Sequence, residues 1–120
     1  MNGRRTAGRD RGSVTVLAAG AVAALLAVAA LAVTVAAATV VRHRATAAAD
    51  LSALAAATTA VAGERAACTR AEWVARQMDT RVVRCQLEGW NAAVEVVATV
   101  PLAPFDATTS AHARAGPAER

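Results

Sequence analysis

The stretch Val14–Val41 reads VTVLAAGAVAALLAVAALAVTVAAATVV, about 28 residues without a charge. As an α-helix it would be roughly 42 Å long at about 1.5 Å per residue, and the hydrocarbon core of a bilayer is only about 30 Å thick. Because every backbone polar group inside lipid must be hydrogen-bonded within its own segment, we expect a helix despite the valines. The rest of the chain holds too little apolar material to enclose such a helix in a soluble core. We therefore predict a membrane-inserted chain.

The same run has an alternative reading as a signal peptide that is later removed. Such peptides have about 7–15 apolar residues before a small-residue cleavage site. Ala36, Ala37 and Ala38 fit that site by residue type, but the apolar core before them is too long. A retained signal anchor is therefore favoured over release near Ala38.

Positive charge is concentrated before the apolar run. All thirteen basic residues of the 120-residue chain are arginine, and its net charge is +4. Residues 1–12 hold four arginines against Asp10, a balance of +3, whereas residues 42–120 hold nine arginines against eight acids, a balance of +1. A nucleic-acid binder would carry this excess on its folded part, often beside aromatic residues. We expect no nucleic-acid partner and read the first four as topology determinants: Arg4, Arg5, Arg9 and Arg11.

The flanking charges and the cysteines predict the same orientation. Four arginines precede the run and only Arg42 and Arg44 follow it closely, so the positive-inside rule leaves the N-terminus in the cytoplasm. Cys68 and Cys85 both follow the run, and an even pair in a small exported domain is read as a disulfide. A bridge between them would close a loop of about 17 residues and stabilise the domain by about 3 kcal/mol.

Beyond the membrane run, the alanine-dense residues 45–67 contain no proline and no glycine before Gly63. The simplest prediction is one helix from Val14 to Ala62, whose second half leaves the bilayer. Its larger side chains form a stripe that needs a partner surface, either the head domain or a neighbouring molecule: Leu51, Leu54, Thr58 and Val61. Asp50 stands alone in this stretch and either solubilises the helix or pairs with an arginine.

The remaining sequence predicts a small α+β head. Thr69 and Glu72 form a capping box that would open a short helix. From Arg81 the apolar period switches to two, and we expect Val83, Cys85 and Leu87 to face the helices. A second strand is expected to follow the turn at residues 88–91, ending at Pro101 and Pro104 because proline donates no ladder hydrogen bond. Residues 105–120 are either a third, edge strand or a flexible tail. The apolar residues expected on one face of the short helix are Ala71, Val74, Ala75 and Met78, and those on one face of the second strand are Val94, Val96, Ala98 and Val100.

The sequence offers no catalytic constellation, so we expect no enzymatic activity and no cofactor or small-molecule substrate. His43 and His112 lie at opposite ends of the head sequence, which argues against a metal site with the two cysteines. His112 near Ser110 is read as a solvated histidine.

Two segments carry a family resemblance. Residues 11–14 (RGSV) open the apolar run, and residues 42–57 read RHRATAAADLSALAAA. They resemble the N-terminal segment of TadE/TadG-like proteins of the tight-adherence (Flp) pilus and related secretion systems. The continuation through Cys68, Cys85 and a valine-rich strand is similar to the actinobacterial helicase/secretion-neighbourhood TadE-like branch. The resemblance implies a pilin-like architecture and a role in assembling surface appendages or secretion machinery.

The chain departs from the pilin-like pattern at the processing site. Pilin-like precursors are typically cut after a glycine and carry a glutamate at the fifth mature position. If Gly12 is that candidate processing site, the fifth position is Leu17. A membrane-retained accessory component therefore fits better than a major pilin.

These observations predict a membrane α+β protein with a long N-terminal transmembrane helix, a short helix and a small antiparallel hairpin or three-stranded sheet. The predicted divisions are a basic cytoplasmic tail (1–12), the transmembrane helix (13–41), a helix extension (42–67), a disulfide-linked head (68–104) and an edge strand or tail (105–120). We expect a single-pass, pseudopilin-like protein with an exported C-terminus that assembles with other Tad-system subunits; the alternative is a secreted small effector or binding domain. The candidate assembly-face residues are Gly20, Ala24, Asp50, Leu51 and Leu54.

Overall fold

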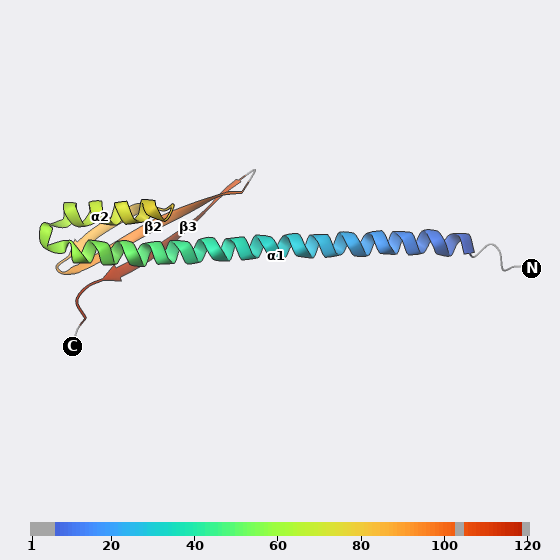
Figure 1. Cartoon of the computed structure of the whole chain (residues 1–120), viewed down its shortest axis with the longest axis horizontal. Coiled ribbons are helices and arrows are strands. Elements are labelled where there is room, and N and C mark those ends of the chain that lie inside the picture. The colour runs from blue at the N-terminus through green and yellow to red at the C-terminus, as the bar shows by residue number, and fades with distance from the viewer. Residues whose placement is uncertain (1–6, 103–104, 119–120) are drawn as a thin grey trace, which may run out of the picture. The chain divides into compact units, whose positions relative to one another are not determined.

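The structure is a computed structural model that describes residues 7–102 and 105–118. Its elements are, in order, α1 (Ala7–Thr58), the 3₁₀ turn η1 (Ala60–Ala62), α2 (Glu64–Gln77), β1 (Arg81–Glu88), β2 (Asn91–Leu102) and β3 (Phe105–Ala115) (Figure 1). The chain divides into two compact units, Met1–Ala37 and Ala38–Arg120, and α1 contributes to both. The predicted layout of a long apolar helix, a short helix and a small antiparallel sheet is confirmed.

In the first unit, every side chain from Arg11 to Ala37 is exposed. Among the described residues, the part of α1 between Arg11 and Thr58 is the one helix long and apolar enough to cross a membrane. Its hydroxyls bond within the helix: Thr15 Oγ1 donates to the Arg11 carbonyl at 3.0 Å, and Thr34 Oγ1 donates to the Ala30 carbonyl at 2.8 Å. Such internal bonds let threonine enter an apolar medium without leaving its hydroxyl unpaired.

The second unit has two layers, with α1 and α2 against one face of the sheet. The core contains almost only small side chains, and its largest fully buried residues are Val96 and Ser52. Alanine on both helices keeps the layers close together, so a thin core can still be dry and tightly packed. The buried cluster is formed by Ala48, Ala49, Ala53 and Ala56 of α1, Ala67, Ala71 and Ala75 of α2, and Ala92, Val94 and Val96 of β2.

The boundary between the first and second helices lies at Gly63 rather than at Thr69. Instead of running to Ala62, α1 ends at Thr58, and Gly63 precedes α2 with a φ of 98°, which favours glycine. The predicted N-cap at Thr69 is wrong. That residue lies inside α2, where its hydroxyl donates to the Arg65 carbonyl at 2.8 Å and so leaves the helix uninterrupted.

The end of α2 is set by Asp79, which has a positive φ of 55°. The Asp79 amide donates to the Arg76 carbonyl and the Thr80 amide to the Ala75 carbonyl, at 3.2 and 3.0 Å. This pair of bonds is a Schellman motif, with an aspartate in the left-handed position that glycine usually takes.

β1 and β2 form the predicted hairpin around Gly89 and Trp90. Gly89 has a φ of 63°, as the first central position of a type II′ turn requires. The predicted inward position of Val83 is wrong: this residue is 50% exposed, while Val82, Cys85 and Leu87 pack against the core. The register shifts between Val82 and Arg84, and such a bulge moves the residues before it to the opposite face.

β3 completes the sheet in the order β1-β2-β3, so residues 105–115 form the edge strand rather than a flexible tail. The prediction that Pro101 ends β2 is wrong, because β2 continues to Leu102 and Pro101 pairs with Asp106. Beyond Val97, β2 is paired with β3 only, and a proline is tolerated where one side of a strand needs no donor. Pro104 lies outside the described residues.

Candidate assembly surface

Beyond the membrane run, α1 presents one face to the head and another to solvent. The covered face is a stripe of small side chains, each 0% exposed: Ala45, Ala48, Ala49, Ser52, Ala53 and Ala56. Steps of three and four residues keep these positions on one side of the helix. This stripe could not be recognised from the sequence, because alanine also occupies the other faces of the helix and hides the period.

The larger side chains of this segment remain uncovered. Leu51 is 48% exposed and Leu54 is 55% exposed, and Val61 of η1 is also exposed. The head is therefore not the partner surface of the predicted stripe. Asp50 is exposed on the same segment and has no ion-pair partner among the described residues. Exposed large apolar residues on an element that already buries another face are candidates for contact with a second molecule.

The uncovered face continues onto the head at the turn between β1 and β2. Leu54, Ala57 and Thr58 line one shallow apolar groove together with Trp90 from the turn and with Gly116 and Pro117 after β3. Trp90 itself is 65% exposed. An exposed tryptophan beside an exposed leucine is a common anchor at protein interfaces.

In the first unit, the two small-residue candidates leave room for close approach. A Cβ atom added at Gly20 would meet nothing within 4 Å, and Ala24 is exposed. Gly12 and Arg11 are also exposed, near the start of the helix. Arg9 lies in α1 by its backbone, and Arg4 and Arg5 lie outside the described residues.

Basic residues surround the helix where the apolar run ends. Arg42, His43 and Arg44 are all exposed. Arg44 Nη1 lies 3.9 Å from Asp79 Oδ2, an exposed pair that contributes little to stability. These three exposed side chains are accessible to lipid headgroups or to a neighbouring molecule.

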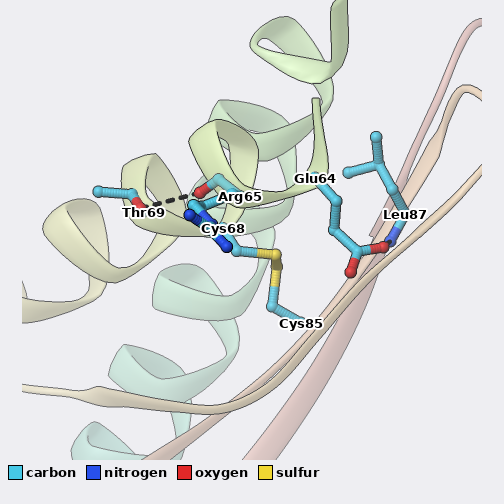
Figure 2. Close-up of a disulfide and its surroundings, with 6 residues drawn as sticks. All are labelled: Glu64, Arg65, Cys68, Thr69, Cys85 and Leu87. Carbon is cyan, nitrogen blue, oxygen red and sulfur yellow. Dashed lines mark hydrogen bonds between the residues drawn. A yellow bond between two sulfur atoms is a disulfide. The ribbon is translucent and has the colours of Figure 1, made fainter. Parts of the chain in front are cut away.

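A disulfide joins the two layers of the head. Cys68 of α2 is bonded to Cys85 of β1, with 5.8 Å between their Cα atoms (Figure 2). Beside it, the Leu87 amide donates to Glu64 Oε2 at 3.2 Å, so the first two turns of α2 are both tied to the same strand. The pairing is the one that the sequence predicts, and it fixes α2 on β1.

The outer face of the sheet is polar. Glu95 of β2 lies 3.9 Å from Arg84 Nε and 3.7 Å from His112 Nδ1, and Arg114 Nη1 lies 3.7 Å from Glu88 Oε2. These groups form a ladder of polar side chains across the three strands. Within the described part of the chain, no three histidine, cysteine, aspartate or glutamate side chains could hold a metal ion together.

Comparison with known proteins identifies a matching protein family and a curated relative. Residues 12–62 match the model of the Flp pilus-assembly TadE/G-like family. A stretch of 48 residues is 52% identical to the apoptosis inhibitor Rv3654c of Mycobacterium tuberculosis, covering 40% of this chain and 57% of that protein. The match therefore spans a little over half the length of this curated relative. No solved structure matches the chain.

Proposed function

Because residues 12–62 match the model of the TadE/G-like family of Flp pilus assembly, we propose that the chain belongs to this family and is a pseudopilin-like membrane subunit of a Tad pilus or a related secretion system. The long apolar N-terminal helix together with this family indicates a membrane anchor. The proposed role is structural: the protein assembles laterally with other pseudopilin-like subunits through α1.

The observation that carries this proposal is the uncovered apolar face of the α1 extension. The head already covers the small-residue stripe, yet Leu51 and Leu54 stay exposed on the other side of the helix. In the membrane run, Gly20 and Ala24 would let a neighbouring helix approach closely, and helix association in lipid depends on such packing. An anchor without partners requires neither feature.

The test is site-specific photocrosslinking in native membranes with a benzophenone amino acid at Leu54. This chemistry leaves the Cys68–Cys85 bridge intact, unlike cysteine crosslinking. We expect capture of a partner of similar size from Leu54 and none from Ser110, which is exposed on β3 at the outer face of the sheet. Ala24→Ile should weaken the capture without preventing insertion. Recovery of monomers alone at every helix position would leave only a simple anchor.

In the proposed orientation the N-terminus is cytoplasmic and the head is exported. The arginines before the run support this orientation, as does a disulfide in the head, because such bonds persist in oxidising compartments. Alkaline phosphatase fused after Arg120 should be active in cells. Activity only when the enzyme is fused before Arg11 would reverse the orientation. We also propose that the protein has no catalytic activity of its own.

A second candidate is a secreted effector released near Ala38. Two observations favour it: the second compact unit begins at Ala38, and the relative from Mycobacterium tuberculosis is named as an apoptosis inhibitor. Against it, α1 is helical on both sides of Ala38, and the apolar core before it is long for a signal peptide. Intact mass of the membrane and medium fractions separates the candidates, since only release yields a product that starts near Ala38.

A further inference from the structure

Asp50 lies on the uncovered surface of the α1 extension, beside the residues proposed for assembly. It directly precedes Leu51 and lies about one helical turn before Leu54, and all three side chains are exposed. A step of four residues keeps Asp50 and Leu54 on the same side of the helix. The acid therefore belongs to the same uncovered surface as the two leucines.

Asp50 has no ion-pair partner among the described residues. A helix can supply a partner three or four residues away, but these positions hold Thr46, Ala47, Ala53 and Leu54. Other acids of the second unit are satisfied within the chain. Glu64 accepts a hydrogen bond from the Leu87 amide. A basic side chain lies 3.9 Å or less from each of Glu72, Asp79, Glu88 and Glu95. The charge of Asp50 is therefore available to a second molecule.

The opposite charge stands earlier on the same helix, at Arg42 and Arg44. We call these two arginines the collar. Both are exposed, and the one ion pair that the structure shows for them joins Arg44 to Asp79. At about 100° per residue the two arginines point to different sides of the helix, so a neighbour on most sides can meet one of them. Asp50 follows them by roughly 9–12 Å at about 1.5 Å per residue, and neither arginine contacts it within the described chain.

Two copies that are anchored in one membrane have parallel α1 helices, and this decides which charges can meet. In register, Asp50 would lie beside Asp50 and the collar beside the collar, and such like charges repel each other. An axial offset of roughly 9–12 Å instead brings Asp50 of one copy level with the collar of the other. Leu51 and Leu54 would keep water away from this contact, and opposite charges attract more strongly where water is excluded.

The length of the apolar run permits this offset. Residues 14–41 form a helix of roughly 42 Å, whereas the hydrocarbon core of a bilayer is about 30 Å thick. The surplus of roughly 12 Å lets two copies differ in depth by the required offset while both runs still span the core. A run that only just matched the core would not allow it.

We propose that a second copy of this chain occupies the uncovered surface of α1, with its collar, Arg42 and Arg44, against Asp50. The inference rests on the proposed function, because it requires α1 to be a membrane anchor that assembles laterally. The opposite charges then select both the partner and the depth at which its helix packs.

The test is charge reversal in trans, in native membranes that contain two tagged forms of the full chain. One form carries a benzophenone amino acid at Leu54, and the other form carries a second tag by which its capture is measured. The first variant is Asp50→Arg, and the second is Arg42→Asp with Arg44→Asp. The matched control is Asp106→Arg, which makes the same change of charge at an exposed position on β3.

The wild-type forms should capture each other. Each variant alone places like charges in the contact, so capture between two copies of the same variant should fall about tenfold or more. A membrane that contains Asp50→Arg in one form and the reversed collar in the other restores opposite charges, and its capture should return to within about twofold of the wild type. Asp106→Arg should behave as the wild type does. Resistance to alkaline extraction and an intact Cys68–Cys85 bridge check insertion and folding.

The outcomes separate this inference from the proposed function. Capture that persists in both variants alone overturns the ion pair and leaves lateral assembly intact. Capture that is lost in both variants and not restored in the mixture also overturns it, because only a contact between copies is repaired in trans. Capture of a different protein in place of the tagged copy overturns the choice of partner and retains the assembly. Monomers alone in the wild type at every helix position overturn the proposed function itself.

Discussion

From Arg11 to Ala37, α1 has no buried face, whereas from Ala45 to Ala56 the same helix buries a continuous stripe against the sheet. Both regions are rich in alanine and neither contains a proline. The first region contains Gly12 and Gly20, and the second contains no glycine. In the first region leucine and valine occupy every side, as expected for a helix surrounded by lipid. In the second region the covered side carries only small residues, and the leucines stand on the uncovered side among further alanines. Overall apolar content is therefore enough to identify the apolar run. The packed extension is identified only by the face of the helix on which small and large side chains lie.

The largest expected effect comes from placing charge in both regions. Ala23→Arg with Ala27→Arg should oppose insertion by about 5 kcal/mol, since each arginine near the helix centre costs about 2.5–3.5 kcal/mol on an insertion scale. Ala47→Arg with Leu54→Arg lies on the exposed face of the extension and should leave insertion unchanged. The measurement is the fraction of protein that resists alkaline extraction from membranes. Equal behaviour of the two pairs would mean that the regions do not differ in their surroundings.

A smaller effect should distinguish the two faces of the extension. Ala53→Leu adds bulk to a fully buried position and should destabilise the head by about 1–3 kcal/mol through overpacking. Ala47→Leu makes the same change on the exposed face and should alter stability by less than about 0.5 kcal/mol. Denaturant unfolding in detergent, followed by near-ultraviolet circular dichroism, measures both. A tolerated Ala53→Leu would argue against close contact between α1 and the sheet.

The same contrast explains which features the sequence could predict. The long apolar helix and the hairpin follow from length or strong periodicity, and both were predicted correctly, whereas the weaker alternation of residues 105–115 left an edge strand and a flexible tail both open. The face of α1 against the head was missed, because the rule that large apolar residues are buried fails where an alanine stripe packs on a sheet of alanine and valine. Leu51 and Leu54 were predicted to need a partner surface, and the structure leaves both of them exposed, so that part of the prediction stays a prediction.

Two local errors have a different cause. Thr69 resembled an N-cap because a threonine three residues before Glu72 matches a capping box, and a sequence does not reveal that its hydroxyl bonds back to Arg65 instead. Val83 was assigned to the wrong face because strict alternation assumes an unbroken register, and the bulge between Val82 and Arg84 breaks it. A bulge depends on tertiary contacts, and the role of a threonine depends on where its helix begins, and periodicity encodes neither. The candidate assembly residues, by contrast, follow from composition and remain predictions.

The smallest expected effect lies within the buried stripe itself. Ser52 is 0% exposed, and within the described structure its hydroxyl has no hydrogen-bond partner. A buried polar group without a partner loses its hydration without compensation, which costs about 1–3 kcal/mol. Ser52→Ala removes that group, preserves the small size that the stripe requires, and also favours the helix by up to about 0.7 kcal/mol. Because relaxation of the surrounding residues offsets part of the gain, we expect stabilisation of about 1 kcal/mol, seen as a rise in Tm of about 4–8 °C for a head of this size.

A matched control distinguishes the effect on Tm of removing a buried hydroxyl from the effect of higher helix propensity. Thr46→Ala changes an exposed position of the same helix, where the hydroxyl already donates to the Arg42 carbonyl at 3.1 Å. It gains propensity without relieving a buried group, so its effect on Tm should be smaller than that of Ser52→Ala. If Ser52→Ala instead lowers Tm, its hydroxyl is bonded in solution. The stripe would then be a polar seam between helix and sheet, and the contrast between the two regions of α1 would rest on hydrogen bonding rather than on residue size.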